Sequence, residues 1–529
     1  MNVSVLIVGA GPSGLSLALA LLQNGISVRI IDKVSTCQTG KRGAGIQPRI
    51  LELQKLLGVL PDIQKKGKFV SPMIQYLPGG QTKTVEVIAY MENTPDRPYA
   101  KTYTKRFSAS TCQNMASQVE LDTELVSFEQ VLDRVVSHVI KTRDGERFEE
   151  SIESQWIIGA DGAHSIVRKT LGLTFLGEIR EGDHVVVGEI YMKKPLLDTN
   201  LWHLWGEAAT KSVILAAYDT GDTGEYGVVC MGRDLDADKM ASSREEFVKA
   251  VYEITGRTDI EFGDVINLSS FQTNVRMVNS YGSGRAFVAG DSAHVHSFTG
   301  GQGLNSGIQD AVNLAWKLAL VQKGLAPQSL IDSYSQERIP VIAEMLDKTS
   351  ELLTKTFTSG GVGQTLKGWN RSYELRQLGV NYRGSPIVVD ETPVKGEETI
   401  DPYRSGNDGT IRGGDRAPDA PGPHFVNDPT RKTSLFDIFG LSYHTHCCFG
   451  CSEELTPPGI VKTVVILPQK PTGVVSADYV LVDGDGYAYK HYNMAEKLTK
   501  IVVVRPDGMI GGLVDGKDGL KQYFSGILL

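Results

Sequence analysis

Glycines at positions 9, 11 and 14, with a carboxylate further along at Asp32, have the types and spacing that bind a dinucleotide. Gly9 permits a tight turn, Gly11 lets the backbone approach a pyrophosphate, and Gly14 lets a helix pack close to a strand. The N-terminus of that helix attracts the anion, and Asp32 can accept hydrogen bonds from a ribose. The motif predicts a bound dinucleotide, and by itself it fits NAD and FAD alike.

The elements expected around these glycines are the ones that such binding requires. Residues 3–8 are apolar and rich in β-branched side chains, which predicts a buried parallel strand. Residues 15–22 carry apolar side chains that suit a buried helix, and Asn24-Gly25 is a stop signal. Residues 28–31 predict a second strand that ends directly before Asp32. A glycine-rich turn without a ligand is the alternative, and the strand–turn–helix–strand order argues against it.

Two further glycine–acid turns also follow apolar strands, far along the chain. They are Asp161-Gly162, in "WIIGADGAHSIVRKTLG", and Gly290-Asp291, in "GRAFVAGDSAH". Ligands of a doubly wound sheet bind beyond the carboxyl ends of its strands. We therefore expect the three turns to surround one elongated dinucleotide. Asp161 has a second interpretation, because aspartate also caps helices and a helix is expected after its turn.

The remaining chain predicts an α/β protein of several domains. Alternating runs over residues 184–231 predict a separate sheet, and a short α/β pattern returns near the end of the chain. A stretch rich in Pro, Gly, Asp and Arg predicts a linker between them. The expected divisions are a nucleotide-binding domain of residues 1–180 and 276–380, a sheet domain of 181–275 with part of 70–118, a linker of 381–430 and a final domain of 431–529.

Composition narrows the class of protein. The 529 residues carry a net charge of −8, with 41% hydrophobic and 22% charged residues, which is ordinary for a globular enzyme. No basic run would attract nucleic acid or an anionic membrane. The six scattered cysteines fit a reducing compartment, and no apolar stretch has the length of a membrane span. We expect a cytoplasmic protein without a metal site, since the histidines are scattered.

Four stretches taken together resemble the flavoprotein aromatic hydroxylases of the p-hydroxybenzoate and phenol hydroxylase type. They are "GAGPSG", "IGADGAHSIVRK", "RAFVAGDSAHVHSFTGGQGLNSGIQDAVNLAWKLA" and "GDRAPD". The resemblance covers about residues 1–350 and, more loosely, the tail. It implies a Rossmann-type FAD-binding domain interleaved with a β-sheet substrate domain, followed by a small thioredoxin-like α/β domain. It also implies that this chain can form a homodimer, as relatives do.

The same resemblance implies the activity. NADH or NADPH would reduce FAD, and the reduced flavin would react with O₂ to give a C4a-hydroperoxyflavin that hydroxylates a small phenolic substrate. Oxidative decarboxylation of a hydroxybenzoate is one variant. A flavin halogenase is a weaker reading, because its tryptophan-containing stretch is absent. An inactive flavin-binding interaction protein is the non-enzyme alternative, and residues 100–118 support it, because they lack the helical period expected there.

The resemblance also implies residue roles. Asp32 would hold the adenosine ribose, Arg42 would contact FAD, and Asp291 would bind the ribityl chain or diphosphate. Asp161 and Arg168 would serve both FAD and the nicotinamide. The pyrophosphate cradle would be Gly9, Gly11, Ser13 and Gly14, and the flavin ring would be lined by Gly301, Gly303, Leu304 and Asn305. A glutamine is also expected on FAD, and the choice between Gln113 and Gln118 stays open.

The substrate side is less well defined by the sequence. Tyr191, Tyr218 and Tyr226 are candidates for activating the phenol, although most tyrosines in such strands serve packing. Ser297-Phe298 stands where many relatives have two prolines, so the local pocket is expected to differ. We expect His294 and His296 to be packed or hydrogen-bonded turn residues. The C-x-x-C of Cys448 and Cys451 is expected to serve packing rather than redox chemistry.

Overall fold

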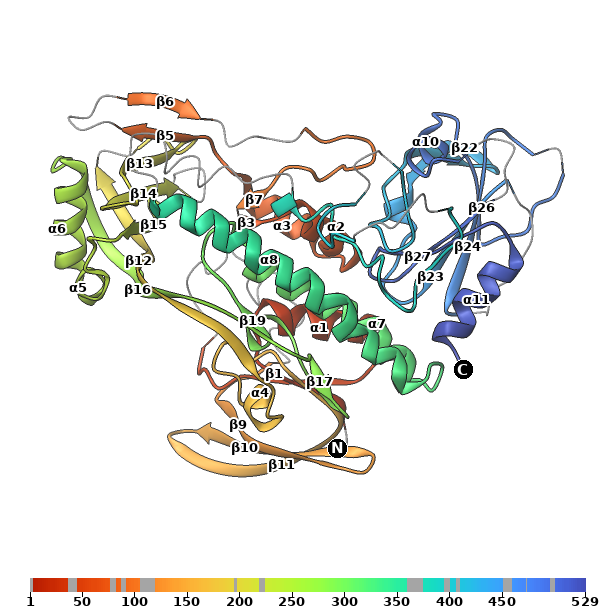
Figure 1. Cartoon of the computed structure of the whole chain (residues 1–529), viewed down its shortest axis with the longest axis horizontal. Helices are drawn as coiled ribbons and strands as arrows, with labels where there is room; N and C mark the ends of the chain where they lie inside the picture. Colours follow the sequence, from red (N-terminus) through yellow and green to blue (C-terminus); the bar gives the residue numbers. More distant parts are fainter. Residues whose placement is uncertain are drawn as a thin grey trace.

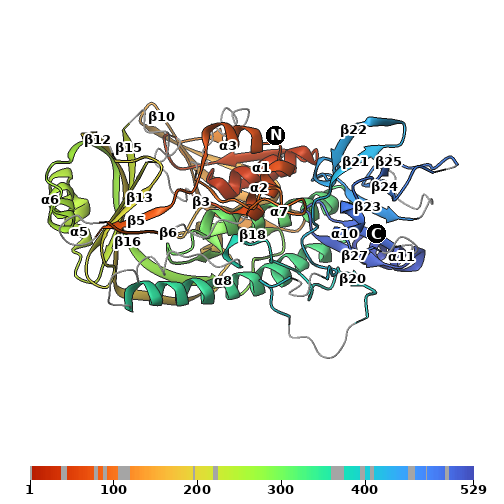
Figure 2. The same ribbon diagram turned by 90° about the horizontal axis from the view of Figure 1, so that it is seen from above.

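The structure is a computed structural model of the chain. It describes residues 3–36, 45–76, 82–86, 92–104, 119–194, 197–217, 224–358, 374–393, 400–405, 410–450, 459–471, 473–494 and 500–529. Arg42, Tyr218, Gln113 and Gln118 lie outside these residues. Figures 1 and 2 show an elongated α/β molecule with three larger sheets along its length. The first sheet lies in the middle, the second carries α6 at one end, and the third lies at the end with the C-terminus.

The first sheet contains the strands that the sequence predicts around the glycine motif. Its order is β17-β18-β11-β1-β2-β8, and β10 and β9 extend it from β11. The four central strands run parallel: β1 (Val3–Val8), β2 (Val28–Ile31), β11 (Glu146–Gly159) and β18 (Ala286–Val288). The others are β8 (Val119–Glu120), β9 (Thr123–Val131), β10 (Arg134–Arg143) and β17 (Gly282–Ser283).

The register of this sheet explains why three distant turns meet. Val8 pairs with both Ile31 and Gly159, and Gly159 pairs with Val288. Neighbouring parallel strands therefore end level with one another, and the turns that follow β1, β11 and β18 emerge at one edge. The helices α1 (Pro12–Gln23), α4 (Ile166–Thr170) and α7 (Gly303–Gln322) begin there or just beyond.

The second sheet has the order β19-β16-β12-β15-β14-β13-β5-β6. Its long strands are β12 (Phe175–Lys194) and β16 (Glu261–Val278). The shorter ones are β5 (Met73–Tyr76), β6 (Thr82–Glu86), β13 (Trp202–Gly206), β14 (Ser212–Ala217), β15 (Glu225–Gly232) and β19 (His294–Val295). The helices α5 (Ala237–Ser242) and α6 (Arg244–Thr255) cover one face, and the end of α8 (Asp332–Thr358) packs on the other.

The third sheet has the order β20-β27-β26-β23-β24-β25-β21-β22. Its strands are β20 (Val389–Asp390), β21 (Pro421–Phe425), β22 (Asp428–Ser434), β23 (His444–Phe449), β24 (Val461–Leu467), β25 (Tyr479–Val482), β26 (Lys500–Val504) and β27 (Ile510–Val514). Its helices are α10 (Tyr487–His491) and α11 (Lys517–Ile527). The stretch 381–430, expected as a linker, contributes β20 and β21 to this sheet, and the domain boundaries stay a prediction.

Smaller elements fill the space between the sheets. The strands β3 (Gly45–Ile46), β4 (Lys68–Phe69) and β7 (Tyr103–Thr104) form a small sheet, next to α2 (Pro48–Leu56) and α3 (Leu60–Lys66). A search of the described helices finds none with both the length and the apolar character of a membrane span.

Candidate cofactor site

The glycines of the three turns allow the turns to pack directly on one another. A β-carbon on Gly9, whose φ is +104°, would collide with the carbonyl oxygen of Ala160 in the second turn. A β-carbon on Gly14 would collide with the carbonyl oxygen of Gly9. The hydroxyl of Ser13 occupies the space where a β-carbon on Gly290, in the third turn, would lie. The structure thus brings together Gly9, Gly14, Ser13 and the two later turns.

Gly11 has different surroundings. No atom of the described structure lies within 4 Å of the position that its β-carbon would take. Gly11 is also the N-cap of α1, which has no side-chain cap and no acidic residue in its first turn. Pro12 has no N–H, so the backbone N–H groups of Ser13 and Gly14 are the ones that can meet an anion in front of Gly11, as in a pyrophosphate site.

Asp32 stands at the carboxyl end of β2, next to the first turn. Its carboxylate accepts hydrogen bonds from the backbone N–H of Ala10 (2.8 Å) and of Val34 (3.2 Å). These bonds hold the carboxylate against the glycine turn and leave it partly exposed. Each carboxylate oxygen can accept more than one hydrogen bond, so Asp32 retains the capacity to bind ribose hydroxyls.

Asp161 contacts the start of α4, whose N-cap residue is Ser165. Its carboxylate accepts hydrogen bonds from Ile166 N–H (2.7 Å), Ser165 Oγ (2.5 Å) and Ser292 Oγ (3.0 Å). Ser292 follows Asp291 directly, so Asp161 also ties the second turn to the third. Ser165 stands 4 residues after Asp161, whereas Ser292 is 131 residues away, so spacing within the sequence could not reveal the contact with Ser292.

Arg168 belongs to the same cluster. Its guanidinium donates to the carbonyl oxygens of Ser292 (3.0 Å) and Ala163 (2.8 Å) and lies 3.8 Å from the centre of the Phe175 ring. Burial lowers the pKa of Arg168 from its ordinary value, and Asp161 acts in the opposite direction. Arg168 thus fixes the two turns, and its expected role towards a nicotinamide stays a prediction.

Asp291 lies exposed at the N-terminus of α7. Its Oδ1 would be 3.8 Å from a β-carbon on Gly303, the first residue of that helix. The imidazole Nε2 of His296 would be 2.9 Å from the same β-carbon, and its Nδ1 lies 2.5 Å from the carbonyl oxygen of Ser297. Burial lowers the pKa of His296, and the nearby Asp291 opposes this. His296 is therefore part of this site, beside the residues that the sequence singled out.

Residues 300–302 form the loop before α7, and residues 303–305 begin the helix. Gly300 and Gly301 have φ values of +79° and +60°, which favour glycine. The buried side chain of Asn305 accepts a hydrogen bond from Gln47 N–H (2.7 Å) and donates one to Gly45 O (2.8 Å). Leu304 is partly buried and packs on the main core. Asn305 therefore joins the loop to β3 through its side chain, which leaves backbone groups as the loop's contact with a ligand.

The tyrosine candidates of the second sheet lie in different environments. Tyr226 is fully buried on the face covered by α5 and α6, and its hydroxyl donates to Leu197 O (2.8 Å). Tyr191 is 41% exposed and lies on β12, where alternation places it on the opposite face with Val185 and Val187. Tyr226 therefore serves packing, and a role of Tyr191 as a substrate contact stays a prediction.

The face of the second sheet that carries Val185 turns towards α8 and the loop before α7. Buried Val185 and Leu204 pack there with Leu353 and Phe357 of α8, and Phe298 is partly buried against the same cluster. Phe298 is the residue found where relatives have proline. The face also carries the buried carboxylate of Glu189, which accepts a hydrogen bond from Asn267 Nδ2 (3.1 Å). We call Val185, Leu204, Leu353, Phe357 and Phe298 the apolar wall. Glu189 adds a polar group to this wall.

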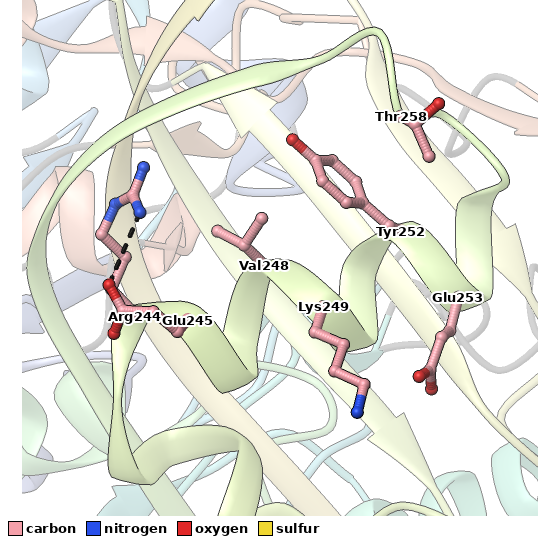
Figure 3. Close-up of a pocket in the computed structure, with 7 residues that line it drawn as sticks. All are labelled: Arg244, Glu245, Val248, Lys249, Tyr252, Glu253 and Thr258. Atoms are coloured by element: carbon pink, nitrogen blue, oxygen red, sulfur yellow. Dashed lines mark ion pairs between the residues drawn. The ribbon is translucent and has the colours of Figure 1, made fainter.

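A surface pocket of about 540 Å³ lies elsewhere, on the outer side of α6 (Figure 3). Arg244, Lys249, Glu245 and Glu253 give it charges of both signs. Figures 1 and 2 place α6 at the end of the molecule, away from the N-termini of α1 and α7. This pocket is therefore separate from the edge at which the three turns meet.

The chain is similar to known flavin-binding proteins over most of its length. A family model described as "FAD binding domain" matches residues 2–349. The chain is 30% identical over 536 residues to a flavin-dependent monooxygenase of Mycobacteroides abscessus, with 99% of this chain and 100% of that protein covered. It is 31% identical over 361 residues to the rifampicin monooxygenase of Streptomyces venezuelae, with 68% and 72% covered.

Full-length similarity extends to further proteins. The pentachlorophenol 4-monooxygenase of Sphingobium chlorophenolicum is 26% identical over 566 residues, with 100% of this chain and 97% of that protein covered. The solved structure of aklavinone-11 hydroxylase with FAD and aklavinone superposes with a TM-score of 0.78 at 20% identity, covering 99% of this chain and 98% of that one. The structural match shows that the two chains share a fold.

Proposed function

The chain belongs to the FAD-dependent aromatic monooxygenases, and on that premise we propose that it hydroxylates a phenolic ring, with NADH or NADPH as reductant and O₂ as oxidant. The observation that carries the proposal is the meeting of three distant turns at one edge of a parallel sheet. Family membership indicates an enzyme rather than the alternative of an inactive flavin-binding protein.

The residues at that edge fit FAD. The open space in front of Gly11, beside the uncapped N-terminus of α1, suits the pyrophosphate, and Asp32 suits the adenosine ribose. Asp291 is exposed at the start of α7, where it suits the ribityl chain. The backbone of residues 300–305 would then border the flavin ring, as Gly301, Gly303 and Leu304 were expected to do.

When bound, FAD supplies the reductive activation of dioxygen. The chain's own residues bind and orient the reactants. The N-terminus of α7 has no side-chain cap and no acidic residue in its first turn, so its N–H groups favour negative charge in front of it. Phe298 and the rest of the apolar wall would keep water from the reacting ring.

The wall also bears on the substrate. Its apolar side chains suit a flat aromatic ring system, and Glu189 with Asn267 would fix a hydroxyl group by hydrogen bonding. Two of the similar proteins are named for large polycyclic compounds, rifampicin and aklavinone. We therefore infer a polycyclic phenol rather than a single-ring hydroxybenzoate, and hydroxylation without loss of carbon dioxide.

Product analysis tests this proposal. The purified protein is incubated with FAD, NADPH or NADH, and a panel of single-ring and polycyclic phenols, and products are identified by mass. The expected product retains every carbon and gains one oxygen atom. A product that has lost carbon dioxide would favour the decarboxylation variant. Oxidation of the nicotinamide without any oxygenated product from the panel would contradict the proposed substrate class.

A further inference from the structure

A buried ionic cluster joins the third sheet to the helices of the nucleotide-binding region. Arg505, directly after β26, donates to both carboxylate oxygens of Glu337 on α8 (2.7 and 2.9 Å). It also contacts Asp507, with Nη2–Oδ2 at 2.5 Å. Lys317 of α7 donates to Glu337 from the other side at 2.7 Å. The side chains of Arg505, Glu337 and Lys317 have no exposed surface.

Each charge in this cluster depends on the others. Burial alone would raise the pKa of Glu337, but Arg505 and Lys317 outweigh burial and hold that pKa well below its ordinary value. Burial lowers the pKa of Lys317 to about 8, against the opposing effect of Glu337. Loss of one partner from a buried pair leaves an uncompensated charge, which costs far more than an exposed pair would. Asn313 and Ser385 also donate to Glu337, at 2.7 Å each, and Arg505 adds the contact that engages both carboxylate oxygens. Loss of Arg505 therefore removes a charge that compensates Glu337 and frees one hydrogen-bonding position on each oxygen.

The next residue of α8 continues the contacts towards the cofactor edge. Arg338 donates from Nε to Asp310 Oδ1 of α7 at 2.7 Å. The other oxygen of Asp310 accepts the backbone N–H of Gly290 at 3.0 Å and lies 2.7 Å from His294 Nε2. Gly290 precedes Asp291, so the contacts reach the third turn without a gap.

A second branch runs from Arg338 to the loop before α7. Its Nη1 donates to Gln309 Oε1 (3.3 Å), and Gln309 donates to Gln377 (2.8 Å). Gln377 donates to Oε1 of Gln302 at 2.5 Å, and Gln302 is the N-cap of α7. The turn at Gly290 and the loop at Gln302 are thus both connected by hydrogen bonds to Arg338. Arg338 follows Glu337 directly on α8.

We propose that Arg505 is a positioning residue for FAD binding and that the region around the third sheet is part of the cofactor scaffold. Arg505 fixes Glu337, and with it the turn of α8 that carries Arg338. Arg338 in turn sets Asp310 and Gln309, which hold the turn at Gly290 and the loop at Gln302. Packed interiors shift between discrete arrangements rather than deforming smoothly, so a displaced Glu337 moves the whole set.

The test measures FAD affinity in the full-length chain. Apo protein is titrated with FAD and binding is followed by flavin fluorescence, for wild type, R505M and R505K. R505M is expected to weaken binding by roughly tenfold, within the usual range of coupling between sites. R505K is expected to lie between the two, because lysine keeps the charge but cannot reproduce the two-pronged contact with Glu337.

The matched control is V464A. Val464 is fully buried in β24, on the side of the third sheet away from the cluster, so its truncation destabilises the same region without touching a charge. V464A is expected to lower thermal stability and to leave FAD affinity unchanged. Wild-type affinity in R505M, or equal weakening by V464A and R505M, would overturn the proposal. If R505M does not fold, R505K decides by the same two outcomes. The test measures FAD binding and not substrate turnover. Its result therefore does not depend on which phenol the enzyme hydroxylates.

Discussion

At the scale of single residues, the glycines of the first turn divide into those that serve folding and one that serves binding. Gly9 and Gly14 lack space for a β-carbon because backbone of the protein itself is in the way. Gly11 has that space, and its φ of −70° suits any residue. The sequence motif predicted the same division, with Gly11 for the pyrophosphate and Gly9 and Gly14 for the turn and the packing.

Gly11→Ala is therefore expected to leave the apo protein stable and to weaken FAD binding. The added methyl group would stand where the pyrophosphate approaches, and a loss of at least about tenfold, ~1.4 kcal/mol, is expected. Gly14→Ala is expected to destabilise folding itself by about 1–3 kcal/mol through overpacking. Urea unfolding of the apo variants and FAD titration check the pair. Equal effects of the two variants on unfolding would contradict it.

The tyrosines of the second sheet give a second paired prediction. Tyr191→Phe is expected to lower kcat/KM for the phenol about tenfold, the usual effect of losing one strong hydrogen bond. Tyr226→Phe removes the bond to Leu197 O in the core and should cost about 1 kcal/mol of stability with little effect on turnover. Steady-state kinetics and thermal unfolding separate the two. A larger loss of turnover in Tyr226→Phe would reverse the assignment.

At the scale of elements, the sequence predicted the strands and helices around the first turn because their apolar periods are strong. It could not predict that β5 pairs in parallel with β13, because that pairing joins strands distant in the chain. It also could not place Tyr226, since the face of a strand residue depends on pairing register. Asp161 stayed open between two roles for the same reason, as its partner Ser292 comes from another turn.

Strand β23 carries an element-scale prediction about pH. Burial lowers the pKa of His444 to about 3 and that of His446 to about 4, and neither ring nitrogen of His446 has a hydrogen-bond partner among the described residues. The unfolded chain takes up these protons near pH 6.5, whereas the folded chain does so only near pH 3–4. Stability should therefore fall as pH drops below about 6.5, by up to about 1.4 kcal/mol per pH unit for each histidine.

Urea unfolding between pH 7 and pH 5 measures this slope. His446→Leu places an apolar side chain at this buried position, and leucine cannot take up a proton. The slope of its unfolding free energy against pH is therefore expected to be smaller by up to about 1.4 kcal/mol per pH unit. His138→Leu is a matched control, because His138 lies near the surface on β10 and hydrogen bonds to Ser151. An unchanged slope in His446→Leu would show that this buried imidazole does not govern the acid sensitivity.

At the scale of the whole molecule, the third sheet buries both apolar side chains and charged side chains of α7 and α8. Trp316, Leu320 and Leu330 pack into its core cluster, beside Lys317 and Glu337. Composition predicted residues 381–430 as a linker because Pro and Gly are frequent there. Composition does not record that Tyr382, Tyr403 and Asp415 are buried, which depends on contacts across the molecule.

A chain that ends at residue 380 is accordingly expected to be insoluble or to lose FAD. Truncation would expose the apolar side chains around Trp316 and leave Glu337 without Arg505. The soluble yield and the flavin content of the truncated and full-length proteins check this. A soluble truncated protein that binds FAD with full affinity would contradict both this expectation and the role given to Arg505.

The long strands β12 and β16 have a mechanical consequence. β12 has 20 residues, about 65 Å when extended at 3.3 Å per residue, and it runs from the cofactor region into the second sheet. Its ladder with β16 shifts register between Ile179 and His184. A paired ribbon bends most easily where its ladder is interrupted, so residues 180–183 are expected to be the weakest part of the β12–β16 pairing. Amide protons there should exchange with solvent faster than those of Val185–Gly188, and hydrogen–deuterium exchange measures the difference.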